Sequence, residues 1–89
     1  MDAYGESEQA TGWFTIIDQH LAVPFKTVIL GVEATVAKID ITNDDRIVAL
    51  LSREGSSVTI PILDLPLPTR LPKGAEWVIA YRRWASERA

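Results

Sequence analysis

Apolar residues near the N-terminus recur with helical spacing, and this pattern, repeated near the C-terminus, most constrains what the chain can fold into. Trp13, Ile17 and Leu21 lie four residues apart, so they form one stripe along an α-helix. Ser7 is a residue type that caps helix N-termini, and Pro24 ends the helical pattern. We therefore predict an amphipathic helix that begins near Ser7 and ends before Pro24.

The C-terminal stripe is largely aromatic. Its members occupy positions i, i+3, i+4 and i+7 of one helical face: Trp77, Ala80, Tyr81 and Trp84. They predict a second amphipathic helix, from about Lys73 to Glu87. Arg82 and Arg83 lie in its C-terminal half, where positive charge interacts favourably with the helix dipole. We interpret these two arginines as part of a solvated helix face.

The segment between the helices is rich in residues that favour β-structure. We predict four short strands, at residues 25–30, 32–41, 46–52 and 58–62. Apolar residues occur on both faces of the second strand, which indicates a twisted strand whose buried face switches along its length. Residues 47–51 of the third strand are all apolar, so this strand is predicted to be central, whereas Pro61 marks an edge or a strand end.

A connector rich in proline and leucine, residues 61–72, leads to the second helix. It is too apolar for a flexible linker, so we expect an ordered loop that wraps the core. The 89 residues, 47% of them hydrophobic, are predicted to form one domain spanning residues 1–89. The expected fold is α+β: a small curled antiparallel sheet, an SH3-like open barrel, flanked by N- and C-terminal amphipathic helices.

Composition argues against several classes of function. The chain has no cysteine, which excludes disulfides and thiolate chemistry and favours a reducing cytoplasm. A formal net charge of −3 argues against nucleic-acid binding, and no apolar run is long enough to span a membrane. The N-terminus lacks the basic and apolar regions of a signal peptide.

Catalytic motifs are also missing from the sequence. His20, near the end of the first predicted helix, is the single histidine. With one histidine and no cysteine, the chain offers few residues for a catalytic triad or a zinc site. We interpret His20 as a structural residue. The five glycines are scattered and form no phosphate-binding loop. We therefore expect no enzymatic activity.

The densest group of oxygen ligands is the segment 40–45. Asp40, Asn43, Asp44 and Asp45 carry carboxylate and amide oxygens, the donors that Ca²⁺ prefers. Neither alignment of this segment with the EF-hand loop fits, because the required Gly or a required oxygen ligand is missing. On the residues alone, this segment favours an ordinary polar hairpin turn, with a non-EF-hand calcium site as the alternative.

The opening of the chain resembles the CcbP-like family of bacterial calcium-binding proteins. The resemblance rests on residues 2–13, which read DAYGESEQATGW, and on the pair Pro24-Phe25 that follows. It continues at the other end with Glu76-Trp77 and with Tyr81 and Trp84. It implies a small cytoplasmic protein that binds Ca²⁺ without an EF-hand and without catalysis. Asp40, Asn43, Asp44 and Asp45 are predicted as ligands from their oxygen density, not from the family.

An interaction module without a metal is the alternative prediction. Small barrels bind protein partners through loops or exposed edge strands. In this chain the leucines of the connector, residues 63–71, are the expected contact surface for such a partner. Their burial in the folded protein would weaken this alternative.

Overall fold

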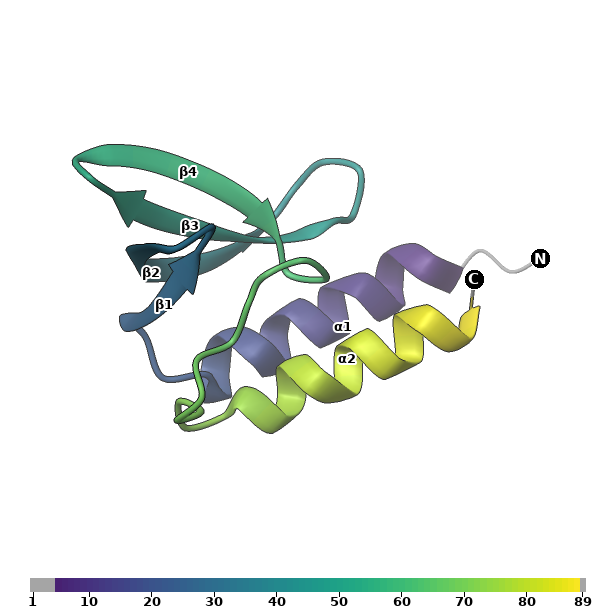
Figure 1. The fold of residues 1–89 in the computed structure, drawn as a ribbon. Coiled ribbons are helices and arrows are strands. Elements are labelled where there is room, and N and C mark those ends of the chain that lie inside the picture. Colours follow the sequence, from purple (N-terminus) through teal and green to yellow (C-terminus); the bar gives the residue numbers. More distant parts are fainter. Residues whose placement is uncertain (1–4, 89) are drawn as a thin grey trace.

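The computed structural model describes residues 5–88, which form two helices and four strands in the order α1-β1-β2-β3-β4-α2 (Figure 1). The helices are α1, Gly5–His20, and α2, Ala75–Arg88. The strands are β1, Phe25–Ile29; β2, Val32–Ile41; β3, Ile47–Arg53; and β4, Ser56–Pro61. The α+β class and the antiparallel sheet between two terminal helices are confirmed; the likeness to an SH3 barrel stays a prediction.

The strands form one antiparallel sheet in which each strand pairs with its neighbour in the sequence, in the order β1-β2-β3-β4. The apolar strand β3 lies between β2 and β4, as its continuous apolar run predicts, and Ile47, Ala49 and Leu51 are buried there. β4 is an edge strand that ends at Pro61, which fits the inability of proline to donate a backbone hydrogen bond.

A β-bulge in β2 produces the predicted switch of its buried face. Val36 pairs with Leu51 and Lys38 with Leu50, so Ala37 is an extra residue with no partner on β3. Before the bulge the buried residues of β2 are Ala34 and Val36; after it the buried residue is Ile39. The bulge therefore allows both halves of this long strand to supply residues to the same core.

Both helices pack beneath the sheet and lie alongside each other (Figure 1). Ile17 and Leu21 of α1 and Val78 and Tyr81 of α2 are buried in the core. Trp13 of α1 contacts the Tyr81 ring, with the ring centroids 5.7 Å apart. The two predicted aromatic and apolar stripes are thus the faces through which the helices meet the sheet and each other.

The helix boundaries differ slightly from the prediction. α1 begins at Gly5, so Ser7 lies inside the first turns and is not the N-cap. α2 begins at Ala75 rather than near Lys73. Gly74 has a φ of +88°, which is incompatible with a right-handed helix and sets the later start.

The connector from β4 to α2 is ordered, as predicted. Leu65 is buried in the core and Leu67 packs against it. The buried Thr27 hydroxyl donates a hydrogen bond to the Pro66 carbonyl at 2.7 Å, which ties the connector to β1. Leu63 and Leu71 remain about half exposed, so the connector is only partly buried. Neither helix of the described residues is long and apolar enough to cross a membrane.

Candidate metal site

The turn between β2 and β3 holds three of the four residues predicted to bind a metal. Its backbone is closed by two hydrogen bonds: the Thr42 N–H donates to the Arg46 carbonyl at 2.8 Å, and the Asp45 N–H donates to the Thr42 carbonyl at 3.1 Å. The Arg46 N–H also donates to the Thr42 hydroxyl at 3.1 Å. The turn is therefore ordered, and it presents Asn43, Asp44 and Asp45 to solvent.

Asp44 already has two partners within the turn. The Thr42 hydroxyl donates a hydrogen bond to one carboxylate oxygen, and the Arg46 guanidinium pairs with the other at 3.2 Å. The hydrogen bond from Thr42, a backbone hydrogen bond and the charge of Arg46 together hold the pKa of Asp44 below its ordinary value. Any cation that binds Asp44 must therefore compete with Arg46.

Asp40 lies before the turn, on the exposed face of β2 opposite Val48. One of its carboxylate oxygens accepts the N–H of Ile41 at 2.8 Å. The structure thus groups Asn43, Asp44 and Asp45 in one turn and places Asp40 on the adjoining strand. Whether these four residues bind a metal stays a prediction.

A hollow of about 270 Å³ lies beside this turn. Two carboxylate residues from separate segments line it: Asp45 from the β2–β3 turn and Asp64 from the turn after β4. The rest of its lining consists of Arg46, Ile47, Pro61, Leu63 and Tyr81. The hollow is the place where the predicted acidic turn meets a second acidic residue.

The sheet topology explains why these segments meet. β3 and β4 are antiparallel, so the start of β3 lies beside the end of β4, and Val48 pairs with Pro61. The Ile62 N–H continues this ladder by donating to the Ile47 carbonyl at 2.9 Å. Figure 1 shows the β2–β3 turn and the loop after β4 at the same end of the sheet. Sequence reasoning gave Asp64 no metal role, although the hairpin it predicted already implied this neighbourhood.

Helix α2 contributes Tyr81 to the lining of the hollow, and its Arg82 contacts the turn after β4. Tyr81 is only 7% exposed, and burial raises the pKa of its hydroxyl. Arg82 donates from Nε to the Ile62 carbonyl at 3.1 Å and from its terminal nitrogen to the Leu65 carbonyl. Burial lowers the pKa of Arg82, and the charge of Asp64 opposes this shift. The prediction that Arg82 is a solvated residue is wrong, because its guanidinium reaches under the connector; Arg83 is exposed as predicted.

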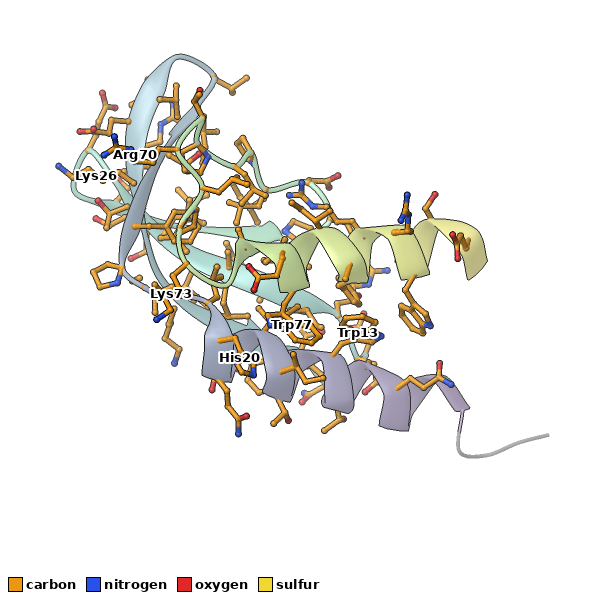
Figure 2. The ribbon with its side chains drawn as sticks, turned by 90° about the horizontal axis from the view of Figure 1, so that it is seen from below. Trp13, His20, Lys26, Arg70, Lys73 and Trp77 are labelled. Carbon is orange, nitrogen blue, oxygen red and sulfur yellow. The ribbon has the colours of Figure 1, made fainter. Side chains whose placement is uncertain are left out.

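His20 takes no part in this hollow. Its ring stacks on Trp77, with the centroids 5.4 Å apart, and Figure 2 shows the two side chains at the junction of the helices. The structural interpretation of His20 agrees with this packing. Residues 1–4, which include the first three residues of the stretch DAYGESEQATGW, lie outside the described residues.

The donor chemistry around the hollow suits a hard cation such as Ca²⁺, which binds carboxylate, amide and carbonyl oxygens. In the part of the chain that the structure describes, no three His, Cys, Asp or Glu side chains gather closely enough to hold a metal on their own. A Ca²⁺ ion bound between Asp45 and Asp64 would take its remaining ligands from backbone carbonyls, amide oxygens or water. Arg46 and Arg82 add positive charge nearby, which disfavours a cation in the hollow.

A comparison with protein families indicates which ion the chain binds. The family model Calci_bind_CcbP, described as calcium binding, matches residues 1–85. The chain belongs to the CcbP-like calcium-binding family. The family assignment confirms the resemblance at the chain's two ends and makes Ca²⁺ the ligand. No curated protein and no solved structure gives a significant match.

Proposed function

We propose that this member of the CcbP-like family is a non-catalytic Ca²⁺ buffer or sensor, acting in the cytoplasm through a site that is not an EF-hand. We place the ion in the hollow between the β2–β3 turn and the turn after β4. Asp45 and Asp64 are its central carboxylates, and Asn43 and Asp44 belong to the same β2–β3 turn as Asp45. The observation that carries this proposal is that two carboxylate residues from separate segments line one hollow in a chain of a calcium-binding family.

The experiment is calorimetric titration with Ca²⁺, with Mg²⁺ as the competing ion. Asp45→Asn and Asp64→Asn each remove one charge while keeping the side-chain shape, and each is expected to weaken Ca²⁺ binding at least about tenfold. Glu54→Gln is the matched control, because Glu54 is an exposed acid in the β3–β4 turn, at the opposite end of β3. Asp40→Asn, tested in the same way, decides whether the fourth predicted ligand belongs to the site.

Two results would reject different parts of the proposal. If the wild-type protein gives no heat at millimolar Ca²⁺, calcium binding by this chain is wrong. If it binds but both Asn variants bind equally well, the ion lies elsewhere in the molecule. Unchanged binding in Glu54→Gln shows that a loss in the other variants is not a general effect of net charge.

Buffer and sensor roles can be separated through the aromatic residues. Tyr81 lines the hollow, and its ring also contacts Trp13 and Trp84, with centroids 5.7 and 5.8 Å apart. A sensor that changes conformation on binding should therefore change its tryptophan fluorescence, whereas a buffer with a rigid site should not. The Phe variant Tyr81→Phe serves as a control for direct effects of the tyrosine hydroxyl.

The alternative role as an interaction module keeps part of its support. Leu63 and Leu71 are 47% and 50% exposed, whereas Leu65 is buried. Two separated half-exposed leucines form a weaker contact surface than the continuous one that was predicted. This role becomes the leading candidate if the Ca²⁺ titrations fail.

A further inference from the structure

We propose that Arg82 is a positioning residue for the calcium site: it holds the turn that carries Asp64 in the conformation that binds the ion. This inference rests on the proposed function, because it assigns a role within the same hollow. The side chain lies behind the turn, and it binds two of the turn's carbonyl groups without lining the hollow itself.

Three contacts fix the turn. The Asp64 N–H donates to the Pro61 carbonyl at 2.9 Å, which closes the turn from the strand side. The Arg82 guanidinium then binds the Ile62 carbonyl through Nε at 3.1 Å and the Leu65 carbonyl through a terminal nitrogen. These two carbonyls flank Asp64 on either side. One planar group thus sets the distance between the two ends of the segment from which the carboxylate projects.

The anchoring points are the most deeply buried residues of the loop. The side chains of Ile62 and Leu65 are 0% and 1% exposed, whereas Leu63 and Asp64 between them face solvent. The core holds the ends through their side chains, and Arg82 holds the same ends through their backbone. The exposed middle therefore has little freedom to move, and Asp64 needs little further ordering when it binds an ion.

Charge alone predicts the opposite effect, and this makes the role testable. Arg82 and Asp64 attract each other, so the positive charge of Arg82 disfavours a second cation at Asp64. If charge were its main influence, removal of the guanidinium would tighten Ca²⁺ binding. If positioning is its main influence, removal weakens binding. Lysine keeps the charge but cannot form the same planar pair of hydrogen bonds, so it separates the two effects.

The test is the Ca²⁺ affinity of Arg82→Lys and Arg82→Gln, measured calorimetrically, with Arg83→Gln as the control. Arg83 is the neighbouring arginine of α2 and is exposed, so its substitution changes the same charge without touching the turn. We expect both Arg82 variants to bind about tenfold more weakly, as is typical when an outer-shell partner of a ligand is lost. We expect Arg83→Gln to bind within about twofold of the wild type.

A double-mutant cycle with Asp64→Asn separates positioning from a general loss of stability. If Arg82 acts through Asp64, Arg82→Lys has little further effect in the Asp64→Asn background. In EDTA, where no Ca²⁺ is bound, the amide resonances of Leu63 and Asp64 in Arg82→Lys should differ from those of the wild type. Thermal unfolding in EDTA shows that each variant is folded, and Arg82→Lys decides the question if Arg82→Gln is unfolded.

Three results would overturn the inference. These are wild-type affinity in Arg82→Lys, tighter binding in Arg82→Gln, or an equal loss of affinity with and without Asp64. Failure of the proposed function looks different, because the wild-type protein itself then binds no Ca²⁺, or Asp64→Asn binds as the wild type does.

Discussion

At the scale of single residues, the β2–β3 turn is defined by competition for the carboxylate of Asp44. Thr42 and Arg46 already satisfy both of its oxygens. Its neighbour Asp45 instead lines the hollow that Asp64 shares. The density of acidic residues in the sequence pointed to this turn, but it could not show that Thr42 and Arg46 both bind the Asp44 carboxylate.

The first prediction concerns the pKa of Asp44. Because the Thr42 hydroxyl is the main cause of its lowered pKa, Thr42→Val should raise this pKa toward its ordinary value, whereas Thr42→Ser should not. A lowered folded-state pKa contributes stability that is present above the unfolded-state pKa and is lost as the pH falls through the folded-state value. Titration of the carboxyl carbon by NMR measures it, and an equal pKa in all three proteins would contradict the assigned cause.

The second prediction concerns Arg46 as a competing cation. Arg46→Gln should tighten Ca²⁺ binding by up to about fivefold, since an exposed ion pair of this kind contributes at most about 1 kcal/mol. The gain should shrink at high salt, because exposed charges are screened. Arg70→Gln is the control, since Arg70 is exposed and does not line the hollow. Weaker binding in Arg46→Gln would mean that Arg46 shapes the turn more than it competes with the ion.

At the scale of secondary-structure elements, the junction of the helices depends on Gly74. A Cβ atom at this position would lie 2.0 Å from the His20 carbonyl oxygen, and its φ is +88°. The Ala22 N–H donates to the Lys73 carbonyl at 2.7 Å next to this contact. The end of α1 and the start of α2 are therefore joined backbone to backbone, with no room for a side chain.

The third prediction follows from this close approach. Gly74→Ala should lower the free energy of unfolding by about 2 kcal/mol or more, a melting temperature lower by roughly 10 °C for a domain of this size. Gly12→Ala is a matched control of opposite sign, because a Cβ at Gly12 meets nothing within 4 Å in the middle of α1. Thermal unfolding followed by circular dichroism measures both. A Gly74→Ala protein as stable as the wild type would show that the junction adapts.

The elements were predicted more accurately than their ends. The mixed faces of β2 indicated the face switch that the bulge at Ala37 produces. The conformations of the β1–β2 and β3–β4 turns could not be predicted. Their first residues, Leu30 and Glu54, adopt positive φ, a conformation that these residue types rarely favour. The start of α1 was placed two residues late because Ser7 is a residue type that caps helices, and helix ends are defined only to within one or two residues.

At the scale of the whole molecule, the proposed site exists only because the chain folds back on itself. Asp45 and Asp64 are separated by all of β3 and β4 and meet when these strands pair. Arg82 of α2 then donates hydrogen bonds to two backbone carbonyls of the segment that carries Asp64. The sequence shows each acidic turn separately, so it does not indicate which two turns lie together in the fold. It also does not show that Arg82 binds carbonyl groups 17 and 20 residues earlier in the chain.

The fourth prediction tests the central claim that one Ca²⁺ ion joins these two segments. It is a titration of the isotope-labelled wild-type protein with Ca²⁺, followed by amide NMR. We predict saturable shifts that appear together at residues 42–46 and 62–65, with the same apparent Kd and with little change in the β3–β4 turn. Shifts confined to one of the two segments, or a set of shifts elsewhere in the chain, would contradict the account.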